Sequence, residues 1–149
     1  MGREVRVQCL DSCCNYSKEL RYQPGWVGIA RLGHFREELL AGEEDYPEAV
    51  EILQNGGELQ SHGVYLCPKC KEHVTSKAFY CITYVSEAFE EYTYDGVEED
   101  IYDVAFPFGI PKCDNCGTDL QYIDEDFFDS IKCPKCGGKA LFEEYGLYD

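Results

Sequence analysis

The chain has 149 residues, with 13 lysines and arginines against 29 aspartates and glutamates, and its formal net charge is −16. This length suits one ordinary domain or two small lobes, and the acidic excess disfavours binding of nucleic acid, because phosphate contacts depend on Lys and Arg. The sequence has no apolar run that could span a membrane and no apolar signal core at its start, so no membrane contact and a reducing, cytoplasmic setting are predicted.

The N-terminal part of the chain predicts two short strands, a glycine-rich loop and two helical segments. In the loop, Trp26 is expected to be a packed anchor over a small core. Pro47 suits the first turn of the second helix, and Asn55-Gly56-Gly57 supplies its end. In chain order these elements cover 5–8, 18–22, 24–28, 35–40 and 47–53.

The C-terminal part predicts strands separated by one long acidic stretch. The strand over 78–85 is the clearest, because it is dense in aromatic and β-branched residues. Within it, Cys81 has no partner at short spacing and is interpreted as a buried structural thiol. The acidic stretch over 87–103 is expected to be a solvated loop or weak hairpin. The other strands are predicted over 64–66, 101–108, 120–123, 127–131 and 140–142.

Four short cysteine clusters, which we call hooks, carry the strongest chemical signal. Hook 1 is Cys9-Leu-Asp-Ser-Cys13-Cys14, and hooks 2, 3 and 4 are the Cys-x-x-Cys pairs at 67–70, 113–116 and 133–136. A tetrahedral Cys₄ site takes two hooks, so four hooks predict two metal sites. A disulfide scaffold is the weaker interpretation in a reducing setting. The predicted ligands are Cys9, Cys14, Cys67, Cys70, Cys113, Cys116, Cys133 and Cys136.

The residue after a hook is expected to adopt a left-handed backbone conformation, which glycine reaches without penalty. Gly117 and Gly137 meet this demand, whereas Lys71 makes hook 2 less ideal. In hook 1, Asn15 is the best non-glycine residue for a positive φ. Its position favours Cys14 over Cys13 as the second ligand of that hook, although both spacings are tolerated.

Hooks 3 and 4 and their flanking strands, over 108–143, resemble the zinc-ribbon (rubredoxin-like knuckle) superfamily. The resemblance implies a structural metal and a binding module, not a reaction. Two zinc ions are expected, with iron as the chemical alternative. The short spacing between hooks 3 and 4 favours sequential pairing (hook 1 with 2, hook 3 with 4), and the alternative is a cross-braced arrangement as in RING-type modules.

The predicted fold is therefore a small metal-bound α+β protein with two zinc-ribbon-type β lobes. The N-terminal lobe would cover 1–86, with a helical insertion over about 24–60. An acidic connector over 87–104 would lead to a C-terminal zinc ribbon over 105–149.

Catalysis is not expected, because four cysteines leave no open metal position. His73 could replace a sulfur, but eight hook cysteines already suffice. The first functional hypothesis is a protein-interaction or adaptor module, with exposed tyrosines at 92, 94, 102, 145 and 148. The second is nucleic-acid binding by the N-terminal lobe, since residues 1–36 carry six basic and three acidic groups. The predicted contact residues are Arg21, Trp26, Arg31, Lys69 and Lys71.

Overall fold

The computed structural model describes residues 2–12, 14–84 and 102–148. The chain divides into two units whose segments alternate along the sequence. Unit 1 consists of Met1–Ala30, Ser61–Ala78 and Ile110–Asp149, and unit 2 of Arg31–Gln60 and Phe79–Gly109. These units differ from the predicted lobes, because strands from both ends of the chain join the same unit. Most of the predicted acidic connector lies outside the described residues.

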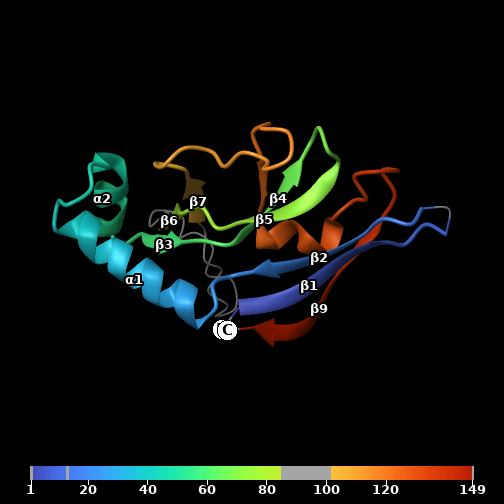
Figure 1. Cartoon of the computed structure of the whole chain (residues 1–149), viewed down its shortest axis with the longest axis horizontal. Helices are drawn as coiled ribbons and strands as arrows, with labels where there is room; N and C mark the ends of the chain where they lie inside the picture. The colour runs from blue at the N-terminus through green and yellow to red at the C-terminus, as the bar shows by residue number, and fades with distance from the viewer. Residues whose placement is uncertain (1, 13, 85–101, 149) are drawn as a thin grey trace, which may run out of the picture. The chain divides into compact units, whose positions relative to one another are not determined.

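The outer sheet of unit 1 joins the two ends of the chain. It has the strand order β2-β1-β9, with both pairs antiparallel, and consists of β1 (Gly2–Cys9), β2 (Ser17–Tyr22) and β9 (Ala140–Tyr148). Figure 1 shows blue β1 between β2 and red β9. Val5 and Val7 are fully buried on one face of β1, as the alternating pattern of a half-buried strand requires.

The inner sheet of unit 1 has the same arrangement of strands as the outer sheet. Its three strands lie between β2 and β9 in the chain. Its order is β5-β4-β8, again antiparallel, with β4 (Gly63–Cys67), β5 (Glu72–Ser76) and β8 (Gln121–Ile123). Each sheet is thus a hairpin whose first strand also pairs with a later strand. Of the four hairpin strands, β1, β2 and β4 form where strands are predicted, because short apolar runs lie beside the hooks, whereas β5 was not predicted.

A short 3₁₀ helix, η1 (Glu125–Ser130), replaces the strand predicted over 127–131. That prediction was wrong because the backbone turns here: the N–H of Phe127 donates to the carbonyl oxygen of Asp124 at 3.0 Å, and the N–H of Ile131 donates to that of Phe128 at 3.4 Å. Phe127 is exposed, whereas Phe128 stacks on Phe142 of β9 with ring centroids 4.0 Å apart. Phe128 also meets the ring of Tyr22 edge-on. The helix therefore contributes one aromatic side chain to the core of unit 1.

The core of unit 1 contains residues of both sheets. Members of the outer sheet supply most of it, and Val64 of β4 and Ile131 join them. Apolar burial of this kind is the main stabilising term for a small unit. The buried members are Val5, Val7, Cys9, Tyr16, Leu20, Tyr22, Val64, Ile131, Cys133 and Ala140.

Unit 2 places two helices beside a third small sheet. Helix α1 (Trp26–Leu40) begins in unit 1 and continues in unit 2, where it is followed by α2 (Pro47–Gln54). The sheet has the order β3-β6-β7 and consists of β3 (Glu58–Gln60), β6 (Tyr80–Tyr84) and β7 (Tyr102–Ala105). Figure 1 shows α2 beyond the C-terminal end of α1.

Close packing in unit 2 explains several residues of its sequence. Its buried core comprises Leu39, Ala49, Leu53, Leu59 and Cys81. Cys81 is the buried structural thiol that the sequence predicts, and burial raises its pKa to about 11. Gly57 approaches α2 so closely that a Cβ would lie 2.4 Å from Ile52 Cγ2. Any larger residue there would force α2 away from the sheet.

Two predictions about the region after β2 are wrong. The stretch 24–28 was expected to be a loop, but α1 already begins at Trp26. Trp26 was expected to be a packed anchor, yet 61% of it is exposed. The glycines of this stretch do not prevent the helix, because helix propensity is a weak preference that tertiary context overrides. Among the described residues, no helix is both long enough and apolar enough to cross a membrane.

Candidate metal centres

The eight predicted ligands gather into two groups of four in unit 1. The outer tetrad consists of Cys9, Cys14, Cys133 and Cys136, and the inner tetrad of Cys67, Cys70, Cys113 and Cys116. Within each tetrad all four sulfur atoms lie within 4.8 Å of one another. We call the outer sheet with its tetrad the outer module, and the inner sheet with its tetrad the inner module.

The pairing of the hooks is nested. Hook 1 meets hook 4, and hook 2 meets hook 3. The predicted sequential pairing is therefore wrong, and the cross-braced alternative is not formed either. The strands decide the pairing, since β9, directly after hook 4, pairs with β1, which ends at hook 1. In the same way β8, which follows hook 3, pairs with β4, which ends at hook 2.

The distances between sulfur atoms fit a tetrahedral metal. In the outer tetrad, Cys9 and Cys136 lie 3.6 Å apart, as do Cys14 and Cys133. In the inner tetrad the corresponding distances are 3.5 Å and 3.9 Å. A tetrahedral ion with metal–sulfur bonds of about 2.3 Å separates its ligands by about 3.8 Å, whereas a disulfide requires about 2.05 Å. The donor set and its spacing therefore suit a thiophilic metal ion.

Backbone N–H groups point at several of these sulfurs. The N–H of Cys70 donates to Cys67 Sγ at 3.3 Å, that of Gly138 to Cys136 Sγ at 3.4 Å and that of Asp11 to Cys9 Sγ at 3.4 Å. Such hydrogen bonds favour the thiolate, which is the form that binds metal. The tight turn of each hook supplies these donors without help from the rest of the fold.

The backbone after the hooks follows the prediction at three of four positions. Gly117 and Gly137 have positive φ angles of 72° and 77°, and Lys71 adopts the same conformation with φ 55°. Asn15 is not among the described residues with positive φ. Cys14 nevertheless lies in the outer tetrad, as predicted, for a reason other than the conformation of Asn15. Cys13 lies outside the described residues.

The thiols of a tetrad do not ionise equally. Hydrogen bonds with the side chain and backbone of Thr118 lower the pKa of Cys116 to about 6. Burial opposes ionisation of Cys133, but backbone N–H groups of its own hook lower its pKa to about 7. The neighbouring cysteines hold the pKa of Cys70 at about 12. In the inner tetrad, negative charge thus forms readily on Cys116 and is opposed on Cys70, which is the electrostatic setting that a bound cation relieves.

A buried tyrosine–histidine pair joins the two modules. The Tyr16 hydroxyl is hydrogen-bonded to Nδ1 of His73 at 2.8 Å and accepts the backbone N–H of His73, also at 2.8 Å. His73 is almost fully buried, and burial lowers its pKa to about 4, so the ring is neutral. His73 is not a member of either tetrad. Sequence reasoning missed this link, although both residues stand shortly after a hook.

A second link runs between the hooks themselves. Lys135, inside hook 4, donates from Nζ to the carbonyl oxygen of Cys70 in hook 2 at 3.0 Å. The two candidate metal centres are therefore neighbours within unit 1. The sequence offers no signal for this contact, because it joins residues 65 positions apart.

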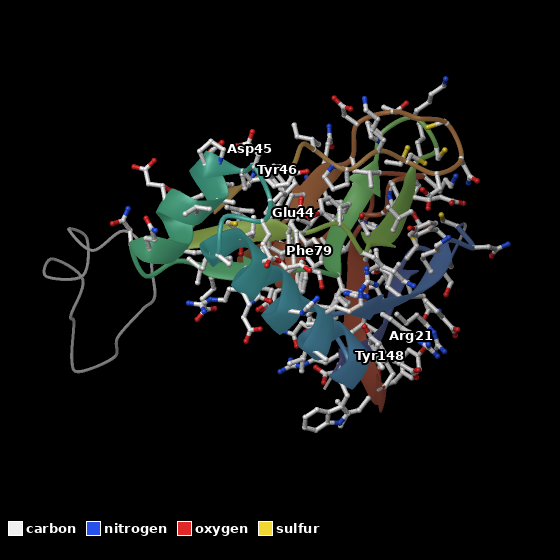
Figure 2. All side chains as sticks on the ribbon, turned by 60° about the vertical axis from the view of Figure 1, so that its left-hand side comes forward. Arg21, Glu44, Asp45, Tyr46, Phe79 and Tyr148 are labelled. Carbon is white, nitrogen blue, oxygen red and sulfur yellow. The ribbon has the colours of Figure 1, made fainter. Side chains whose placement is uncertain are left out.

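The predicted contact residues do not form one group. Arg21 forms an ion pair with Glu4 at 3.3 Å. Its guanidinium also lies over the ring of Tyr148, and Figure 2 labels these two residues. Trp26, Lys69 and Lys71 are exposed in unit 1, and Arg31 is exposed in unit 2. Of the five tyrosines predicted to be exposed, Tyr145 is, and Tyr148 is partly buried. Tyr92 and Tyr94 and the side chain of Tyr102 lie outside the described part of the structure.

No family model matches this sequence, and it has no match among curated proteins or solved structures. The two cysteine tetrads are therefore what suggests a zinc-ribbon-like site. Their geometry supports two metal ions in a small α+β protein.

Proposed function

We propose that this protein is a non-catalytic adaptor in which two zinc ions hold a rigid platform for binding another protein. Catalytic zinc keeps one coordination position open for water or substrate. Each tetrad instead offers four sulfurs at tetrahedral spacing, which fills the coordination shell. The metal then contributes to folding, on the order of 10 kcal/mol for each site.

Zinc is the proposed metal, because a closed tetrahedral Cys₄ shell suits a redox-inactive ion. The proposed setting is the cytoplasm, where thiols remain reduced. Elemental analysis of protein purified without added metal is expected to give about two zinc ions per chain. Iron at that stoichiometry, accompanied by visible absorbance, would show a different metal.

The basic groups near the N-terminus are not all free to bind phosphate. Four of them form ion pairs within unit 1, which cancels much of the positive potential of that segment. Individual surface pairs contribute little to stability, but a phosphate would have to compete with each of these carboxylates. The pairs are Arg3–Glu144 at 3.2 Å, Arg6–Glu19 at 3.0 Å, Lys18–Glu72 at 3.6 Å and Arg21–Glu4 at 3.3 Å. This neutralisation disfavours the nucleic-acid hypothesis.

The observation that carries the adaptor hypothesis is the apolar start of α1. Trp26, Val27 and Ile29 are 61%, 70% and 42% exposed within the first helical turn. Grouped apolar side chains on the surface of a protein mark contact sites, and Trp is among the residues that most often dominate binding energy. A helix that presents such side chains suits insertion into a partner's groove.

The adaptor hypothesis is tested by quantitative affinity capture with metal-loaded protein. The double variant Trp26→Ser and Ile29→Ser is expected to lose captured partners at least about tenfold relative to wild type, since a buried Trp anchor contributes about 2 kcal/mol or more. Phe127→Ser is the matched control, because Phe127 is as exposed as Trp26 but lies on η1. Equal capture by all three proteins contradicts the hypothesis.

A second measurement addresses the nucleic-acid alternative. Titration with single-stranded RNA and duplex DNA at low salt is expected to show no binding, since the basic segment is largely neutralised. Binding that weakens steeply with salt would favour the alternative instead.

A further inference from the structure

The hooks concentrate lysine in a strongly acidic protein. Six of the 13 basic residues are lysines within three positions of a tetrad cysteine. They are Lys69, Lys71, Lys112, Lys132, Lys135 and Lys139. The simplest explanation is that these lysines offset the negative charge of metal-bound thiolates. That explanation does not account for which of these lysines form ion pairs with carboxylates and which do not.

Hooks 3 and 4 differ at one matched position. Each hook is closed by a single antiparallel bridge between the residue before it and a residue after it. In hook 3 the bridge joins Lys112 to Asp119, whose side chains form an ion pair at 2.9 Å. In hook 4 it joins Lys132 to Lys139, so two positive charges stand directly opposite each other. Opposed like charges are destabilising.

The lysines of hook 4 lack compensation. Among the described residues, neither Lys132 nor Lys139 has a carboxylate partner, and both are exposed. The same is true of Lys69 and Lys71 in hook 2. A protein with 29 acidic residues thus leaves these four lysines without an ion pair in the part of the chain that the structure describes.

Three hooks meet where these lysines lie. Leu10 of hook 1 donates its backbone N–H to the carbonyl oxygen of Lys139 at 3.0 Å. Lys135 of hook 4 bonds the backbone of hook 2 at Cys70. The Leu10 side chain is 61% exposed. We call the resulting surface the knuckle face, defined by Leu10, Lys69, Lys71, Lys132, Lys135 and Lys139.

We propose that the knuckle face binds an acidic peptide segment that carries an apolar side chain. The lysines match its carboxylates, and Leu10 matches its apolar group. The inference rests on the proposed adaptor function and adds a second contact of defined chemistry, separate from the apolar start of α1.

Nucleic acid fits the knuckle face less well. Single-stranded nucleic acid is held by aromatic side chains that stack on its bases, and the four hook segments contain no aromatic residue. The net charge of −16 repels a long polyanion. A short acidic segment can stay within the attraction of the lysines, which extends over one Debye length, ~8 Å.

The test uses the full metal-loaded chain and a fluorescein-labelled peptide composed of Glu, Asp and Leu. Fluorescence anisotropy is expected to show binding that is at least about tenfold tighter than for the same peptide with Lys in place of its acids. A peptide without Leu is expected to bind more weakly than the first. A single-stranded oligonucleotide of equal charge that binds more tightly than the peptide would overturn the proposal.

The position of Lys139 corresponds to that of Asp119 in hook 3, and substitution of Lys139 tests the proposal directly. Lys139→Asp gives hook 4 the Lys–Asp bridge that hook 3 already has, so folding is expected to be unharmed. Affinity for the acidic peptide is expected to fall about tenfold. Lys77→Glu is the control, because Lys77 is exposed in unit 1 outside the hooks and the substitution changes the charge equally.

The outcomes separate this proposal from its alternatives. Equal peptide affinity in the two variants overturns it, and loss of metal by Lys139→Asp shows that the lysine serves the metal site instead. If Lys139→Asp leaves peptide affinity unchanged while the Trp26 and Ile29 double variant still loses its partners, the adaptor function stands without the knuckle face. If Lys139→Asp weakens peptide binding while the double variant captures its partners normally, the knuckle face remains as the binding surface.

Discussion

The outer and inner modules are built from the same parts but close over very different lengths of chain. Each has a hairpin with a hook in its turn and a third strand that follows a second hook. The inner tetrad joins Cys70 to Cys113, 43 positions apart, whereas the outer tetrad joins Cys14 to Cys133, 119 positions apart. Loop-closure entropy alone makes the outer closure about 1 kcal/mol more costly.

The nesting makes the modules unequal in a second way. The inner module lies within the chain segment that the outer tetrad must close. A formed inner module shortens the flexible chain between hooks 1 and 4, so it lowers the entropic cost of outer closure. A formed outer module does not shorten the chain between hooks 2 and 3, because that segment lies entirely inside the one that the outer module closes. The inner module is therefore expected to form independently and the outer module to depend on it.

Among the predictions that distinguish the two modules, removal of metal ligands has the largest expected effect. Cys9→Ser with Cys136→Ser is expected to abolish the outer site and leave about one metal ion per chain. Cys67→Ser with Cys116→Ser is expected to remove the inner ion and also to lower occupancy of the outer site, because hooks 1 and 4 must then close the whole flexible segment between them. Elemental analysis of the two purified variants measures the difference. An inner-site variant that keeps a full equivalent of metal would show that the modules are independent.

The link between the modules is tested by Tyr16→Phe. The substitution leaves both the backbone N–H and Nδ1 of buried His73 without their partner, at an expected cost of about 1–3 kcal/mol in the free energy of unfolding. Urea unfolding of the metal-loaded protein measures it. Tyr145→Phe is the control, since Tyr145 is exposed, and it should change stability by less than about 0.5 kcal/mol. Similar values for both variants would show that the link does not stabilise unit 1.

The same pair predicts how stability depends on pH. His73 has a pKa of about 4 in the folded protein against 6.5 ordinarily, so between these values the unfolded chain binds a proton that the folded chain does not. Stability is therefore complete above about pH 6.5 and falls as the pH is lowered, by about 1 kcal/mol between pH 6.5 and 5.5.

This pH dependence is measured by urea unfolding, with metal content checked at each pH. His73→Gln is expected to lose the additional slope, because its side chain does not titrate. Identical slopes for wild type and variant would assign the pH dependence to the cysteines instead.

The smallest expected effect distinguishes hook 2 from hooks 3 and 4. Lys71 holds a left-handed conformation that Gly117 and Gly137 adopt without penalty. Lys71→Gly is expected to stabilise the protein by roughly 0.5–1 kcal/mol, and Gly117→Ala to destabilise it by about 1 kcal/mol. Thermal unfolding monitors both. A lowered midpoint for Lys71→Gly would mean that the lysine side chain stabilises hook 2 by more than its backbone strain costs.

Local features of the fold were predictable because they depend on neighbouring residues. Strands β1, β2, β4, β8 and β9 beside the hooks follow from short apolar patterns, although β5 was missed. Helix α2 follows from Pro47 and the glycines after it. The start of α1 was missed, since Gly25 and Gly28 suggest a loop, whereas the helix begins directly after the first and includes the second. The 3₁₀ helix was missed for a similar reason, because Phe127 and Phe128 suggest a strand regardless of where their side chains pack.

The sequence by itself determined the four hooks and seven of the eight tetrad cysteines, because each hook is a local turn that aims two sulfurs at one point, but it left Cys13 and Cys14 as alternatives in hook 1. Only the tertiary structure decided how the hooks pair. That choice depends on the pairing of β1 with β9 and of β4 with β8, and on the packing of Phe142 and Phe128 in the core of unit 1. Strand partners distant in sequence are selected by buried surface over the whole unit, and the spacing between hooks carries no record of that selection.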